Sequence, residues 1–288
     1  MKLSSERRRT SPLRMANFSI IVAMNHNSPS SPLNKALIRA ALIADEYCPA
    51  VRADIVSSGV VGYNTTTLLA NDYTMFGVQF EDVQGGGVRL GDLSGNFYGG
   101  PSDGEADNIL VWEDGAYTYY YYGVWGDPAN PDWDNLWYNE DSEDASDTTI
   151  PAGTACWYLR QTDAPSTLTI SGAIKMTSTT KTILANDYTM FSNPYPTAIK
   201  FKDLTIANPY GGPSDGEADN ILVWKNGVYT YYYFGVWGDP ANPDWDNLWY
   251  DEGSNDASET EIEAGLACWY LRQTDTATTL SFASPLAD

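Results

Sequence analysis

A block of 41 residues occurs twice in this chain, and this repeat limits the folds that the sequence can adopt. Residues 98–138 recur as residues 210–250, at an offset of 112 residues. The copies differ only at the pairs Glu113/Lys225, Asp114/Asn226, Ala116/Val228 and Tyr122/Phe234. An offset of this length is the size of a domain rather than of a short solenoid repeat. We therefore expect an internal duplication that yields two domains of the same fold.

The charge and hydropathy of the chain argue against several classes of binding partner and against a membrane-spanning helix. The 288 residues carry a formal charge of −22, and residues 1–53 are basic, so the acidic excess lies in the repeats. Such a surface argues against nucleic acid and anionic membranes as partners. No run approaches the 18 uninterrupted apolar residues of a spanning helix, so none is predicted.

Histidine and cysteine usage excludes several kinds of catalytic and metal site. The single histidine, His26, precedes the repeats, which rules out histidine-based catalysis and histidine-ligated metals within them. Cys48 also lies in the N-terminal region, and no CxxC pair occurs. Cys156 and Cys268 occupy equivalent places in the sequence ACWYLRQ. They are either two buried thiols or a bridge between the domains.

Residues 1–53 differ in composition from the rest and resemble an export signal more than a folded domain. The apolar stretch 33–44 is followed by Val51, Arg52 and Ala53, which predicts cleavage before Asp54 and a secreted or cell-surface protein. Arg39 interrupts the apolar stretch, so a short amphipathic helix is an alternative. A start codon assigned too early, with the true leader beginning near Met24, would also explain the long basic region.

From Asp54 onward the sequence is typical of an all-β protein. Short runs of β-branched and aromatic residues alternate with Gly, Asn, Asp and Pro about every ten residues. The clearest element is a hairpin from Asn108 to Tyr122, with a type I′ turn at Asp114-Gly115 and its counterpart at Asn226-Gly227. Further strands are expected at residues 73–80, 88–93, 134–138, 155–161, 166–172, 188–191 and 198–204.

These strands predict two tandem antiparallel β-sandwiches, with a barrel as the main alternative. The first is expected at residues 54–172 and the second at residues 173–288, with a boundary near Gly172 that is uncertain by several residues.

Aromatic residues gather in the repeats, which hold all ten tryptophans. In the expected strand 116–122, Tyr119 and Tyr121 must face one way and Tyr120 and Tyr122 the other. These rings form either a large core, a protein interface or a face that stacks on sugar rings. The candidate glycan contacts are Trp125, Trp133, Trp137, Trp237, Trp245 and Trp249.

Two acidic loops flank the hairpin, and their alternating oxygen ligands resemble half of a calcium loop. One is PSDGEADN, and the other is GDPANPDWDN, which holds Asp127, Asn130, Asp132 and Asp134. The full EF-hand pattern is absent, and ordinary turn and capping roles explain the same residues. The candidate calcium ligands are Asp103, Glu105, Asp107, Asp215, Glu217 and Asp219.

Three short motifs resemble the β-rich repeats of secreted bacterial surface proteins. These are Asn193-Pro194-Tyr195-Pro196, the hairpin start with Asn220, Ile221 and Trp224, and the pair Gly265 and Trp269. The first copy has Val78-Gln79-Phe80 where the NPYP segment would fall, while Ile150-Pro151-Ala152-Gly153 fits the later part better. The resemblance implies an extracellular or envelope location and a non-catalytic role.

We therefore expect an exported, non-catalytic pair of β-sandwiches with a structural or adhesive role at the cell surface. The alternative is a carbohydrate-binding protein that uses an aromatic face, with polysaccharide or other surface proteins as partners. A glycan hydrolase is a more distant alternative, because no single pair of carboxylates stands out.

Overall fold

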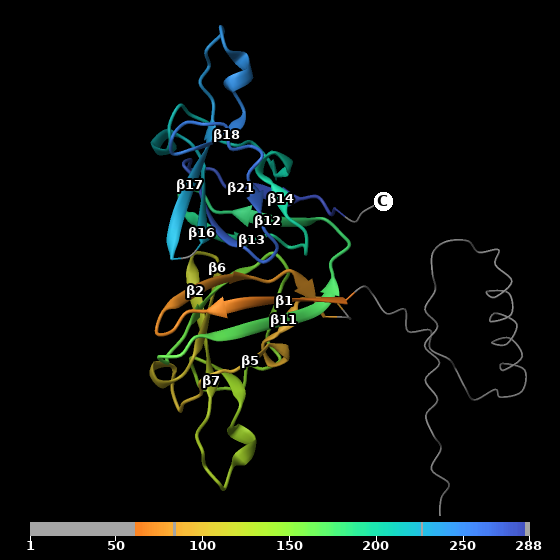
Figure 1. Cartoon of the computed structure of the whole chain (residues 1–288), viewed down its shortest axis with the longest axis vertical. Coiled ribbons are helices and arrows are strands. Elements are labelled where there is room, and N and C mark those ends of the chain that lie inside the picture. The colour runs from red at the N-terminus through yellow and green to blue at the C-terminus, as the bar shows by residue number, and fades with distance from the viewer. Residues whose placement is uncertain (1–60, 83–84, 226, 286–288) are drawn as a thin grey trace, which may run out of the picture. The chain divides into compact units, whose positions relative to one another are not determined.

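The computed structural model describes residues 61–82, 85–225 and 227–285, and there the chain is all-β with antiparallel strands (Figure 1). The predicted leader, with His26 and Cys48, lies outside the described residues. The helical segments in the described ranges are 3-10 turns of three residues. None of those segments is long and apolar enough to cross a membrane.

The elements that contain the first copy of the repeat run from Val61 to Ile174. They are β1 (Val61–Leu68), β2 (Tyr73–Gly77), β3 (Phe80–Glu81), β4 (Val88–Arg89), η1 (Leu90–Asp92), β5 (Ser94–Gly95), η2 (Asp103–Glu105), β6 (Asn108–Glu113), β7 (Ala116–Gly123), η3 (Pro131–Trp133), β8 (Leu136–Asn139), β9 (Thr149–Ile150), β10 (Ala155–Leu159) and β11 (Ser166–Ile174).

The elements that contain the second copy run from Thr179 to Phe282. They are β12 (Thr179–Ile183), β13 (Tyr188–Ser192), β14 (Ile199–Lys200), η4 (Phe201–Asp203), β15 (Thr205–Ile206), η5 (Asp215–Glu217), β16 (Asn220–Lys225), β17 (Val228–Gly235), η6 (Pro243–Trp245), β18 (Leu248–Asp251), β19 (Glu261–Ile262), β20 (Ala267–Leu271) and β21 (Thr278–Phe282).

Each set of strands forms a sandwich-like pair of sheets. In the first set, a five-stranded sheet of order β2-β10-β6-β7-β8 faces a smaller sheet of order β1-β11-β3, to which β5 also pairs. In the second set, the orders are β13-β20-β16-β17-β18 and β12-β21-β15. Apolar side chains of both sheets fill the space between them, since burying such surface is the main favourable term in folding. The first core includes Phe76, Phe80, Ile109, Tyr158, Leu168 and Ile170.

The predicted hairpin is confirmed. Strands β6 and β7 pair from Asn108↔Tyr121 to Glu113↔Ala116, which leaves a two-residue turn. Asp114 and Gly115 have φ angles of 50° and 84°, as a type I′ turn requires at both central positions. Strands β16 and β17 pair in the same register, although Asn226 itself lies outside the described residues.

Several expected strands are shorter than the sequence suggested. The stretch 88–93 divides into β4 and the turn η1, and the stretch 198–204 divides into β14 and η4, because a 3-10 turn follows each two-residue strand. The division expected near Gly172 falls inside β11, which continues to Ile174 and pairs with β1 and β3. The next strand, β12, pairs with β21 of the second set.

The two cysteines are separate buried thiols. Cys156 belongs to the first core and Cys268 to the second, and neither forms a disulfide. Burial raises the pKa of both thiols, because a thiolate would lose its hydration there. The alternative of a bridge between the domains is therefore wrong.

The NPYP segment serves the second core. The side-chain amide of Asn193 donates to the carbonyl oxygens of Thr197 (2.7 Å) and Ile262 (2.9 Å). Tyr195 is fully buried. The Tyr195 hydroxyl donates to the carbonyl of Thr177 at 2.8 Å. These bonds satisfy buried polar groups, so the motif stabilises the fold.

The outer faces of the two five-stranded sheets pack against each other through equivalent contacts. Trp112 meets Trp269, and Trp157 meets Trp224, each with ring centroids 5.4 Å apart and planes at 74°. Met75, Ala155, Met190 and Ala267 are buried in the same cluster. Contact of one surface with its own copy is the arrangement of a twofold-symmetric interface, here formed within a single chain.

Two backbone hydrogen bonds repeat this symmetry. The amide of Gly77 donates to the carbonyl of Gly265 at 2.8 Å, and the amide of Ser192 donates to the carbonyl of Gly153 at 2.9 Å. Gly77 and Ser192 end the equivalent strands β2 and β13, so the two sheets are joined by main-chain bonds as well as by rings.

Replacing Gly77 with alanine should destabilise this junction. A Cβ atom at Gly77 would lie 2.3 Å from the Cβ of Ser192, too close for any rotamer change to relieve. We expect the free energy of unfolding to fall by about 1–3 kcal/mol, as for other overpacked sites, measured by urea denaturation.

The control is Gly104→Ala, because a Cβ there has open space around it. Its effect should stay within about 0.5 kcal/mol. The double variant Gly77→Ala/Ser192→Gly should recover part of the loss. An unchanged midpoint for Gly77→Ala would mean that the sheets are not held this closely.

Candidate functional site

Two equivalent grooves lie between the loop that follows the long central hairpin and the edge strand of each five-stranded sheet. The first has a volume of about 460 Å³ and the second about 450 Å³. The first is lined by Trp125, Asp132, Trp133, Leu136, Tyr138, Ser142 and Asp144. The second is lined by the equivalent residues Trp237, Asp244, Trp245, Leu248, Tyr250, Ser254 and Asp256.

The loop that forms each groove is fixed by hydrogen bonds from its own backbone. In the first copy, the Asp134 carboxylate accepts from the amides of Trp125 (2.6 Å) and Gly126 (3.0 Å). The Tyr138 hydroxyl donates to the carbonyl oxygen of Trp133 at 2.8 Å. The Pro131–Trp133 turn begins with a proline, whose fixed φ suits the first position of a helical turn. These bonds hold the backbone at Trp125 and Trp133 in one conformation.

A glycine allows the rings at the base of the groove to approach the strand. A Cβ atom at Gly123 would lie 2.4 Å from the Trp125 ring and 2.5 Å from the Tyr138 ring. Those rings meet edge to face with centroids 4.5 Å apart, and Tyr121 stacks on Tyr138 at 5.7 Å. The base of the groove is therefore a continuous aromatic surface.

The rim of each groove exposes indole rings to solvent. Trp133 is 51% exposed and its counterpart Trp245 is 49% exposed. In the second groove, Trp237 meets Trp245 with centroids 6.5 Å apart, whereas in the first groove Trp125 lies closer to Tyr138. The two loops have the same sequence, yet the equivalent residues Trp125 and Trp237 place their rings differently.

Polar groups stand beside the exposed rings. Asp132 and Asp144 are exposed, and the Ser142 hydroxyl accepts a hydrogen bond of 3.0 Å from Tyr121. Burial, followed by the charge of Asp144, raises the pKa of Tyr138, which keeps its hydroxyl a donor. Each groove thus combines flat apolar faces with carboxylate acceptors.

Two of the predicted glycan contacts are core residues. Trp137 is 1% exposed and Trp249 is 3% exposed. Trp137 lies in the first core, with its ring 5.3 Å from Phe97 and 5.4 Å from Tyr122. The prediction that these two rings face a ligand is therefore wrong, whereas Trp125, Trp133, Trp237 and Trp245 come together at the grooves.

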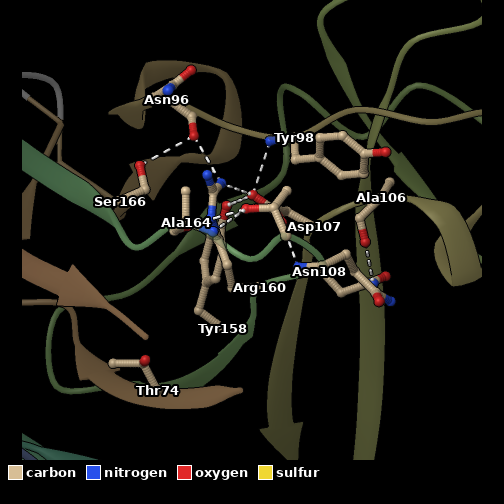
Figure 2. A network of polar contacts seen from close by, with 12 residues as sticks. Thr74, Asn96, Tyr98, Ala106, Asp107, Asn108, Tyr158, Arg160, Ala164 and Ser166 are labelled. Atoms are coloured by element: carbon tan, nitrogen blue, oxygen red, sulfur yellow. Dashed lines mark hydrogen bonds and ion pairs between the residues drawn. The ribbon is translucent and has the colours of Figure 1, made fainter. Parts of the chain in front are cut away.

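Asp107 and Asp219, predicted as calcium ligands, are fully buried and bound to arginine. Figure 2 shows the Asp107 carboxylate among its donors, with Arg160 at 2.5 Å and the Tyr158 hydroxyl at 2.7 Å. The same carboxylate accepts from the backbone amides of Tyr98 and Gln161, each at 2.9 Å. Burial and the adjacent Asp107 charge raise the pKa of Tyr158.

The second copy repeats this network with Arg272 at 2.5 Å and Tyr270 at 2.8 Å from the Asp219 carboxylate. An arginine already neutralises each carboxylate, so the assignment of Asp107 and Asp219 to calcium is wrong. The other four candidates, Asp103, Glu105, Asp215 and Glu217, are exposed in the turns η2 and η5, where calcium binding stays a prediction.

Among the described residues, no group of three or more His, Cys, Asp or Glu side chains is placed to hold a metal ion. The sequence reasoning also missed the arginine partners. The signal was present, since YLRQ occurs in both copies and places an arginine beside an apolar strand in an acidic chain. The groove residues Tyr138, Ser142 and Asp144 were likewise not anticipated.

Comparisons with known proteins give no indication of function, so the functional argument depends on the grooves. No protein-family model, curated protein or solved structure matches the chain.

Proposed function

We propose that this protein is a non-catalytic carbohydrate-binding protein with an adhesive role, and that each aromatic groove takes one saccharide. The observation that supports the proposal is the same groove occurring twice, with a half-exposed tryptophan beside two exposed carboxylates. Flat aromatic rings pack against the apolar C–H faces of sugar rings, and carboxylates accept hydrogen bonds from sugar hydroxyls. A small number of polar groups in an aromatic cleft is the usual composition of a ligand site.

The charge of the groove favours a neutral sugar. Asp132 and Asp144 line the first groove, and Asp244 and Asp256 line the second, in a chain of formal charge −22. Sulfated or uronic acid polysaccharides would bring like charges together, which costs free energy. Neutral hexose or pentose polymers carry hydroxyl donors without that cost.

Binding fits the groove better than hydrolysis. A glycosidase of the usual kind needs one carboxylic acid kept protonated by an apolar pocket, opposite a second carboxylate. Asp132 and Asp144 are both exposed to solvent. An adhesive role at the cell surface, which the leader and the resemblance lead us to expect, would use such binding without turnover.

The test replaces Trp133 and Trp245 together with alanine. We expect native-gel electrophoresis through galactomannan, xyloglucan, barley β-glucan or yeast mannan to retard the wild-type chain. The double variant should bind about tenfold or more weakly, since a well-placed aromatic contact contributes more than about 1.4 kcal/mol.

The matched control is Tyr63→Ala, because Tyr63 is an aromatic residue on β1, 76% exposed and outside the grooves. This variant should migrate like the wild type in every gel. Migration of the wild-type chain unaffected by all four polymers would contradict the proposal.

A further inference from the structure

We propose that the two grooves point away from each other on one rigid unit, so that a single chain joins two separate saccharide chains. This inference rests on the proposed function. It differs from simple avidity, in which both grooves would hold neighbouring parts of one ligand.

The direction of the central strands separates the grooves. Strand β7 begins at the junction between the sheets, where Tyr117 packs in the buried cluster, and ends at Gly123, beneath the first groove. Strand β17 likewise begins at the junction, with Tyr229, and ends at Gly235 beneath the second groove. In Figure 1, the loops that follow β7 and β17 extend to opposite ends of the unit that starts at Ser57.

The separation exceeds the reach of a short oligosaccharide. Each of these strands has eight residues, and a strand rises about 3.3 Å per residue, so each groove lies roughly 25 Å from the junction. Two such lengths in opposite directions place the grooves roughly 50 Å apart. A trisaccharide is much shorter, so it fills one groove without gaining from the other.

The junction keeps this arrangement fixed. The tryptophan pairs Trp112–Trp269 and Trp157–Trp224 and the two backbone bonds from Gly77 and Ser192 tie the sheets at several points. The connection between β11 and β12 consists of residues 175–178 only, and Lys175 within it is paired with Glu81 at 2.5 Å. A short tether and a packed interface leave little freedom for the grooves to turn toward each other.

The experiment compares polymer cross-linking with binding in the full chain. Dynamic light scattering follows mixtures of the protein with galactomannan, xyloglucan, barley β-glucan or yeast mannan over a range of ratios. With a polymer that binds, the wild type should form large particles that dissolve at excess protein, as for any bivalent linker. The single-groove variants Trp133→Ala and Trp245→Ala should each still bind the polymer through the one intact groove. The number of large particles should fall by about tenfold or more.

The outcomes distinguish a failure of cross-linking from a failure of saccharide binding. Retardation in gels without particle growth would overturn cross-linking and leave saccharide binding intact. Particles that persist in both single-groove variants would overturn it too, since they would come from association of the protein with itself. Absence of binding to all four polymers would remove the proposed function, and the inference with it.

Discussion

Replacing Asp107 with alanine should lower the free energy of unfolding by about 3–5 kcal/mol, because the change leaves a buried charge without its partner. Arg160 is only 4% exposed, and its guanidinium forms an ion pair with Asp107 at 2.5 Å. The Tyr158 hydroxyl and two backbone amides would lose their acceptor at the same time. Urea denaturation followed by circular dichroism measures the loss, and Asp219→Ala should show a similar loss in the second sandwich.

The control for this change is Asp103→Ala, four residues earlier, where the exposed side chain accepts a hydrogen bond from the Gly104 amide. It should alter the free energy by less than about 0.5 kcal/mol. The loss in Asp107→Ala should be the same with and without EDTA. A wild-type chain that EDTA destabilises to the level of Asp107→Ala would instead show that this carboxylate binds a metal.

Replacing Trp137 with alanine should be comparably damaging, at about 3–5 kcal/mol, because it removes the largest fully buried side chain of the first core. The ring contacts Phe97 and Tyr122, and both contacts would be replaced by a cavity. The measurement is again the unfolding midpoint in urea, since a change in midpoint at constant slope reports stability.

Trp133→Ala is the matched control, four residues earlier in the turn η3 that precedes β8. Its ring is half exposed, and the contact with Tyr138 uses the Trp133 carbonyl, which alanine retains. We expect this variant to unfold like the wild type while losing saccharide at the first groove. The reverse result, a stable Trp137→Ala and an unstable Trp133→Ala, would mean that Trp133 rather than Trp137 fills the core.

Local patterns predicted the hairpin and the alternation of its tyrosines. An Asp-Gly turn between two apolar runs needs no distant contact, so its geometry follows from two residues. Alternation in β7 likewise sends Tyr120 and Tyr122 to the core and Tyr117 and Tyr121 to the opposite face. The all-β class followed from the same short-range signals.

The roles of Trp137 and Asp107 depended on contacts that the local sequence does not contain. Trp133 and Trp137 are four residues apart, and it is the pairing of β8 with β7 that directs Trp137 into the core. Asp107 meets an arginine 53 positions away, which requires β10 to lie beside β6 in the observed register. Acidic residues near glycine therefore resembled a metal loop until that register was known.

The near-identity of the two copies has a consequence for folding during synthesis. Strands β6 and β16 differ at a single position. In an unfolded chain, β6 could therefore pair with β17, and β16 with β7. All strands of the first sandwich are complete at Ile174, before the repeated block starts again at Tyr210. A chain that emerges from the ribosome N-terminus first can close one sandwich before its twin exists, an order that is lost when the whole polypeptide is diluted from denaturant.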